Sequence, residues 1–132
     1  MDDRARRFLE EHHAAVMATI KADGLPHLAR ISCGLVEGKL WSSGGQTRAR
    51  TKNLRRDPRA TLFIFSDKDP QSWMAAECKV TILEGPEAVD QNLALYRTLA
   101  GEPKDLAEYR AAMVAERRII YEFEIQRTYG QF

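Results

Sequence analysis

Arg48-Ala49-Arg50-Thr51-Lys52-Asn53-Leu54-Arg55-Arg56-Asp57-Pro58-Arg59 is a run of twelve residues with six basic side chains and one acid. The segment before it, residues 38–45, reads Gly-Lys-Leu-Trp-Ser-Ser-Gly-Gly and is typical of a strand that ends at a glycine break. The segment after it, residues 60–65, is typical of another strand. We therefore predict a short basic helix between two strands, with Thr47 or Thr51 near its start and Asp57-Pro58 after its last turn.

The positive charge of this run is local, because the whole chain has a formal net charge of only +1. A globally basic protein would favour nucleic acid or an anionic membrane as partner, whereas a local basic run favours a small polyanion such as a phosphate. No aromatic stacking platform accompanies the run, so we expect no nucleic-acid partner. The alternative interpretation is a solvated helix face.

Backbone N–H groups at the start of the predicted helix would attract an anion, and Arg48, Arg50 and the Thr51 hydroxyl could add hydrogen bonds to it. The helix dipole contributes only about 0.3–1 kcal/mol, so the arginines must provide most of the affinity. The sequence thus predicts a phosphate site at residues 48–51.

Length and composition indicate one domain over residues 1–132, since 15.0 kDa with 44% hydrophobic residues suits a single core. No apolar run approaches the roughly 20 residues that span a bilayer, and the N-terminal residues lack the apolar stretch of a secretion signal. We expect a cytoplasmic protein without a membrane partner. Cys33 and Cys78 are isolated from each other and from the three histidines, which favours two buried reduced thiols and no metal site.

Hydrophobic periodicity predicts the remaining elements. A meander of antiparallel strands, interrupted only by the basic helix, should form the first half, and one long strand, two helices and a last strand should follow. Because closure removes exposed strand edges, we expect a fold that is mainly β with α, a small six-stranded antiparallel barrel with flanking helices. The predicted elements are a helix at 3–13, strands at 15–21, 26–36, 38–45, 60–65, 73–83 and 118–125, and two helices after residue 86. The apolar residues of the two helices lie at 89–99 and 106–113, and Gly101 and Pro103 separate them.

Several motifs, taken together in their order and spacing, resemble the pyridoxamine 5'-phosphate oxidase-like split-barrel superfamily. Two later motifs resemble its actinobacterial branch, which binds the deazaflavin coenzyme F420. The first group comprises residues 18–27, Ser42-Ser43 and residues 53–60, and the second comprises residues 96–102 and 109–118.

The resemblance implies a homodimer of split barrels with two cofactor sites at the interface, and a small-molecule substrate. It implies that the cofactor phosphate is held by Arg48, Arg50, Thr51 and Asn53. It further implies that the ring is bordered by Pro26, His27, Leu28 and Ser43, and that Trp73 reaches it from the partner subunit or else packs in the core. The negatively charged oligoglutamate tail of coenzyme F420 could use Arg55 and Arg56.

The function implied is a coenzyme F420-dependent reductase that transfers a hydride to an unsaturated or aromatic small molecule. An FMN-binding oxidoreductase of the same fold and a non-catalytic cofactor-binding protein are the alternatives. The cofactor carries this chemistry, so the sequence need not contain a dedicated acid or base. His27 could protonate a reduced substrate, or it could only pack beside the ring. Arg30 could contact a substrate carboxylate, or it could pair with a surface acid.

Overall fold

Six antiparallel strands close into a barrel in the computed structural model, which describes residues 1–132. Around the barrel the order is β1-β2-β3-β6-β5-β4, and this confirms the prediction of a six-stranded barrel with flanking helices. The elements are α1 (Asp3–Glu11), β1 (Ala14–Ile20), β2 (Pro26–Val36), β3 (Lys39–Gly45), α2 (Ala49–Arg56), β4 (Arg59–Phe65), β5 (Trp73–Leu83), α3 (Glu87–Ala100), α4 (Leu106–Ala115) and β6 (Arg118–Gln131).

Short turns connect the first three strands. Between β1 and β2, the carboxylate of Asp23 accepts a hydrogen bond of 3.0 Å from the backbone N–H of Leu25, and Gly24 has a φ of +88°. Between β2 and β3, Glu37 and Gly38 have φ angles of +50° and +79°. Two successive positive φ angles match the twist of a two-residue hairpin, so these residues turn the chain tightly.

The meander extends over three strands only, because α2 carries the chain to the far side of the barrel. Strand β4 therefore pairs with β1, where Phe63 lies opposite Val16, and not with β3. Strand β3 pairs instead with β6, where Ile120 lies opposite Ser43. The long β5–β6 ladder, with an irregularity between Glu77 and Cys78, completes the closure.

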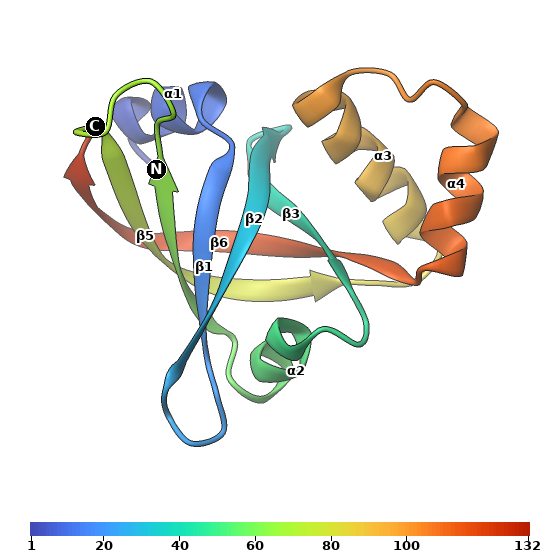
Figure 1. Ribbon diagram of the computed structural model, residues 1–132, viewed down its shortest axis with the longest axis horizontal. Coiled ribbons are helices and arrows are strands. Elements are labelled where there is room, and N and C mark those ends of the chain that lie inside the picture. The colour runs from blue at the N-terminus through green and yellow to red at the C-terminus, as the bar shows by residue number, and fades with distance from the viewer.

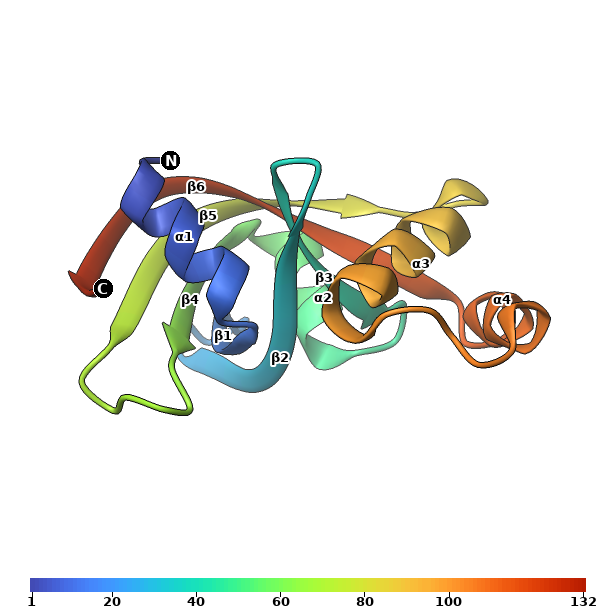
Figure 2. The ribbon, with the colours of Figure 1, turned by 90° about the horizontal axis from the view of Figure 1, so that it is seen from above.

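Helices cover both ends and one side of the barrel. Helix α1 contributes Ala5, Phe8 and Leu9 to the barrel core at one end, and α2 contributes Leu54 at the opposite end (Figure 1). Helices α3 and α4 form a hairpin that lies outside the barrel beside β3 and β6 (Figure 2). A small separate cluster of Trp41, Leu95 and Ile120 joins α3 to these two strands.

Side chains cap the N-termini of α1 and α4, whereas α2 and α3 have no side-chain cap. The carboxylate of Asp2 accepts a 2.8 Å hydrogen bond from the N–H of Ala5 and so caps α1. Thr47 and Thr51 lie near the start of α2, as predicted, but Arg48 occupies the N-cap position and no side chain caps the helix. Thr51 turns inward instead, as described below. The helix ends before Asp57-Pro58, as predicted.

Cys33 and Cys78 are both buried and free, as predicted. Burial raises the pKa of each thiol to about 12. None of the helices combines the length and apolar character that crossing a membrane requires. No group of three or more His, Cys, Asp or Glu side chains is arranged to hold a metal ion.

Candidate functional site

The inner face of the basic helix α2 is fixed to the barrel by Thr51. Its hydroxyl donates a 2.7 Å hydrogen bond to the carbonyl oxygen of Gly45 and also contacts the hydroxyl of Tyr121 on β6. Since the single Thr51 proton goes to the carbonyl, Tyr121 must be the donor in the second bond. Thr51 is fully buried, so the structure gives its side chain an anchoring role. Its predicted contact with a phosphate remains a prediction.

Asn53 is held in a similar way. Its side-chain amide donates to the Thr19 hydroxyl at 3.1 Å, and its amide oxygen accepts from Arg56 at 2.9 Å. Asn53 is buried, and both polar groups of its side chain are occupied within the chain. The structure thus ties α2 to β1 through Asn53, and a phosphate contact by this residue also remains a prediction.

Three cations at the C-terminal end of the run have partners in the fold. Arg55 binds both carboxylate oxygens of Glu84, at 3.1 and 3.0 Å, and this hydrogen bonding lowers the pKa of Glu84. Arg56 donates to the carbonyl oxygen of Ile20 at 2.8 Å in addition to Asn53. Arg59 binds Asp57 at 2.8 and 3.0 Å. These contacts tie Arg55 and Arg56 to the fold, and contact of either residue with a cofactor tail remains a prediction.

The remaining cations of the run, Arg48, Arg50 and Lys52, have side chains without an ion pair or hydrogen bond in the fold. Arg50 is the most informative of these, because its Nε atom is buried and has no hydrogen-bond partner. A buried guanidinium N–H without a partner is costly and indicates that a bound group completes the site.

A basic cavity of about 370 Å³ lies between the start of α2 and the start of β6. Gly44 and Gly45 form part of its wall; Gly44 is buried, and Gly45 is partly exposed. At Gly44 a Cβ atom would overlap the ring of Tyr121, so this position requires glycine. The lining residues are Ser43, Gly44, Gly45, Thr47, Arg48, Arg50, Glu116 and Arg118.

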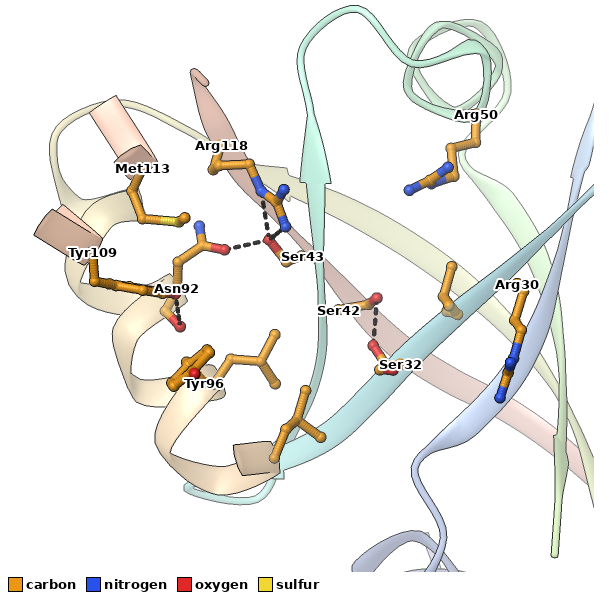
Figure 3. Close-up of a pocket in the computed structure, with 13 residues that line it drawn as sticks. Arg30, Ser32, Ser42, Ser43, Arg50, Asn92, Tyr96, Tyr109, Met113 and Arg118 are labelled. Carbon is orange, nitrogen blue, oxygen red and sulfur yellow. Dashed lines mark hydrogen bonds between the residues drawn. The ribbon is translucent and has the colours of Figure 1, made fainter. Parts of the chain in front are cut away.

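A second cavity, of about 410 Å³, adjoins the basic one on the outer face of β2 and β3. Ser43, Arg50 and Arg118 line both cavities, so the two adjoin at these residues. The α3–α4 hairpin provides an apolar and aromatic wall that consists of Leu95, Tyr96, Leu99, Tyr109 and Met113 (Figure 3). Arg30, Ile31, Ser32, Ser42 and Asn92 complete the lining. No acidic side chain lines this second cavity, and three arginines do.

A hydrogen-bond network joins the two cavities to α3. The hydroxyl of Ser43 donates to the side-chain oxygen of Asn92 and accepts from the Nε and Nη2 atoms of Arg118, at 3.1 and 2.8 Å (Figure 3). Asn92 is only 2% exposed. Its amide nitrogen donates to the carbonyl oxygens of Ala88 and Ile119, at 2.8 and 3.4 Å, which fixes its orientation.

The aromatic wall is also ordered by contacts of its own. The Tyr109 hydroxyl donates to the backbone carbonyl of Asn92 at 3.0 Å, and the rings of Tyr96 and Tyr109 lie 5.0 Å apart at an interplanar angle of 53°. Burial raises the pKa of Tyr109. Tyr109 is therefore a neutral, fixed part of the wall at neutral pH.

Of the residues expected at the ring, the structure brings only Ser43 into these cavities. Pro26, His27 and Leu28 lie at the start of β2, in the hairpin that extends past α2 in Figure 1. Trp73 lies on another face of the barrel, stacked on Phe63 at 5.3 Å and edge-on to Tyr129 at 6.2 Å. Within one chain these four residues do not line either cavity. Their contact with a cofactor ring stays a prediction that depends on a partner subunit.

Arg30 does line the second cavity and forms no ion pair, so the alternative of a surface pair has no support. Sequence reasoning gave no role to Arg118, Asn92, Tyr96 or Tyr109. Asn92 had a usable signal, because an amide within the apolar stripe of a helix must find hydrogen-bond partners when it is buried. Arg118, Tyr96 and Tyr109 were noted only as members of the two motifs that resemble the deazaflavin-binding branch, and no role at the site followed from that.

The model of the pyridoxamine 5'-phosphate oxidase family matches residues 1–132. The chain belongs to this family. A relative from Mycobacterium tuberculosis (strain CDC 1551 / Oshkosh), named F420H(2)-dependent biliverdin reductase, is 26% identical over 134 residues, covering 98% of this chain and 88% of that protein. Membership of the pyridoxamine 5'-phosphate oxidase family and this relative support an oxidoreductase.

Solved structures share the barrel. A conserved hypothetical protein from Mycobacterium tuberculosis has a TM-score of 0.80 at 23% identity, covering 97% of this chain and 82% of its own. A structure named F420 Reductase has a TM-score of 0.77 at 17% identity, covering 96% of each chain. At these identities the likeness establishes the fold alone.

Proposed function

We propose that this chain is a coenzyme F420-dependent reductase that transfers a hydride to an unsaturated or aromatic small molecule. The observation that carries the proposal is that the two cavities adjoin and share Ser43, Arg50 and Arg118. A phosphorylated ring cofactor requires a cationic region for its phosphate and an adjoining apolar region for its ring. The two cavities provide this pair of environments.

The residues present fit a phosphate at the basic cavity. Arg48 has no partner in the fold, and the buried Nε of Arg50 lacks a hydrogen bond. Both are suited to the charge-assisted hydrogen bonds that phosphate oxygens accept, and the absence of a side chain at Gly45 leaves space for the group. In the second cavity, Tyr96, Tyr109 and the aliphatic side chains would contact the ring.

When bound, the deazaflavin supplies hydride transfer, and the chain supplies binding, orientation and exclusion of water. Apart from tyrosine and arginine, no titratable side chain lines the second cavity, and the Tyr109 proton is committed to the carbonyl of Asn92. His27 lies outside both cavities of its own chain. It could protonate a substrate only if the His27 side chain of a partner subunit reached the cavity. We assign no catalytic acid or base.

The relative named F420H(2)-dependent biliverdin reductase suggests biliverdin as one electron acceptor to test. Reduced coenzyme F420 should be mixed with the protein and a panel of unsaturated acceptors that includes biliverdin. Return of the oxidised deazaflavin absorbance, dependent on both protein and acceptor, is the expected result. If no acceptor in the panel accelerates reoxidation of the bound cofactor, the reductase proposal loses its support.

An FMN-binding oxidoreductase is the second candidate, because FMN also joins a phosphate to a ring of similar size and suits the same cavities. The matching family is that of pyridoxamine 5'-phosphate oxidase, which favours a flavin, whereas the 26% identical relative favours the deazaflavin. A non-catalytic cofactor-binding protein is the third candidate, and it would bind cofactor without accelerating its reoxidation.

We also infer a homodimer, formed through an apolar face on the outside of β1, β2, β4, β5 and β6. Leu28 is 64% exposed and Phe63 42% exposed on this face, which surrounds a hollow of about 520 Å³. A contiguous exposed apolar surface of this kind favours an interface. A second copy is the proposed partner, because it would also bring the Pro26–Leu28 segment and Trp73 near a cofactor site. The face is lined by Val16, Ala18, Leu28, Thr61, Leu62, Phe63, Trp73, Ala75 and Tyr129.

A further inference from the structure

Arg118 occupies the boundary between the two cavities and faces Arg50 from the other side of β3 (Figure 3). We propose that Arg118 and Arg50 together hold the phosphate oxyanion of the ligand, and that Ser43 and Asn92 are positioning residues for Arg118. This inference rests on the proposed function for the identity of the cofactor. It adds a binding residue outside the basic run.

The hydroxyl of Ser43 cannot donate to a ligand while this network is intact. Its one proton goes to the side-chain oxygen of Asn92, whose amide nitrogen is held by two backbone carbonyls. The lone pairs of the Ser43 oxygen then accept from Arg118. The hydroxyl therefore acts on a ligand through Arg118 by fixing the direction of its guanidinium.

Arg118 retains hydrogen-bonding capacity after these contacts. A guanidinium has five N–H groups, of which two go to Ser43 and one goes to Glu116 at 3.3 Å. Two N–H groups remain for a ligand. Glu116 is about half exposed at the rim, so its contact with Arg118 is long and solvated and leaves the guanidinium cationic.

Charge at the boundary favours an oxyanion. Arg50 brings a buried N–H without a partner, and Arg118 brings a guanidinium held in place on β6. Two arginines that face one site would repel each other unless an anion lay between them. A phosphate oxygen shared by both would satisfy the Arg50 group and reduce this repulsion.

The test compares a phosphorylated ligand with its phosphate-free counterpart. Coenzyme F420 and the deazaflavin riboside that lacks phosphate should be titrated into wild type, Arg118→Gln, Ser43→Ala and the double variant, with circular dichroism to confirm folding. Arg117→Gln is the matched control. It removes the charge of the neighbouring residue, and Arg117 lines neither cavity.

We expect Arg118→Gln to weaken F420 binding about tenfold to a hundredfold and to change riboside binding less than about threefold. Ser43→Ala should weaken F420 binding as well, but it should cause no further loss when Arg118 is already replaced. Arg117→Gln should resemble wild type.

Equal losses for the two ligands, no loss in Arg118→Gln, or additive effects of Ser43→Ala would overturn the assignment. If wild type fails to bind F420, the proposed cofactor is wrong, and the same variants are then compared with FMN and riboflavin. If the variants lose affinity for FMN but not for riboflavin, the result would support phosphate binding by Arg118 and Arg50 with a flavin as cofactor. Equal losses for FMN and riboflavin would overturn the assignment.

Discussion

The hydroxyl of Tyr121 on β6 donates a hydrogen bond to the hydroxyl of Thr51 on α2. Through this contact, the helix that carries the basic run is fixed to the strand that begins with Arg118. Both residues are fully buried, and Gly44 leaves the space that the Tyr121 ring occupies. The two sides of the basic cavity therefore have a common anchor in the barrel interior.

Tyr121→Phe should lower the free energy of unfolding by about 0.5–1.5 kcal/mol, because the Thr51 oxygen loses its donor while the ring is kept. It should also weaken cofactor binding slightly, since α2 is less well fixed. Chemical denaturation measures the first effect. Tyr129→Phe, on the same strand with an exposed side chain, is the control and should match wild type. Equal stability of Tyr121→Phe and wild type would contradict the anchoring role.

Arg48→Ala and Arg50→Ala should each weaken cofactor binding about tenfold to a hundredfold, the penalty for losing a charge-assisted hydrogen bond. Arg59→Ala should change it little, because the Arg59 side chain is already bound to Asp57. Fluorescence titration of the three variants measures the affinities. The same affinity in all three variants and wild type would place the phosphate elsewhere.

Phe63→Glu should convert the proposed dimer into a monomer, because it places a charge in the centre of the apolar face. Val114→Glu is the control, since Val114 is an exposed apolar residue on α4 outside that face. Light scattering coupled to size exclusion measures the mass of each variant. A monomeric wild type, or a Phe63→Glu variant that stays dimeric, would refute this interface.

Asp57 should titrate at an unusually low pH, because hydrogen bonding by Arg59 lowers its pKa to about 2. In the unfolded chain the pKa of Asp57 is about 3.9. The lower folded-state pKa therefore stabilises the fold at pH values above about 3.9, and this stabilisation is lost as the pH falls through about 2. NMR titration of the carboxyl measures this pKa. In Arg59→Gln it should rise only part of the way, since the backbone N–H of residue 59 still donates. An ordinary pKa in wild type would disprove the pairing.

The order of elements was predictable because each has a local signature. A glycine break marks the end of β3, and Asp57-Pro58 marks the end of α2. Alternating apolar residues mark β4, so the sequence predicted the basic helix between two strands. The pairing of β4 with β1 was not predicted, since the path of a crossover depends on which faces pack and not on local pattern. The inward position of the Thr51 side chain was not predicted for the same reason, because its partner Tyr121 lies 70 residues away in the sequence.

The charge pattern identified two residues that line the basic cavity, whereas tertiary contacts decide which other residues lie there. Arg48 and Arg50 line the basic cavity, as the charge pattern indicates. Arg55 and Arg56 belong to the same pattern but are bound by Glu84 and by backbone and amide oxygens. Arg118 lies far from the basic run in the sequence, and no spacing pattern relates it to Arg50.

The proposed function predicts tighter binding of the deazaflavin than of FMN because of charge beyond the phosphate. Coenzyme F420 carries an oligoglutamate tail, and Lys52 is an exposed cation on α2 that has no partner in the fold. Exposed charges are screened over about 10 Å at 0.1 M ionic strength, so the preference should shrink as salt rises.

Titration of the purified apoprotein with coenzyme F420 and with FMN tests the central claim most directly, with cofactor fluorescence and protein thermal stability followed together. The proposed function predicts tighter binding of coenzyme F420 at low salt, a larger stabilisation by it at equal concentration, and a smaller difference at high salt. Binding of FMN as tight as that of coenzyme F420, or tighter, at low salt would contradict the deazaflavin assignment and favour the flavin-dependent alternative.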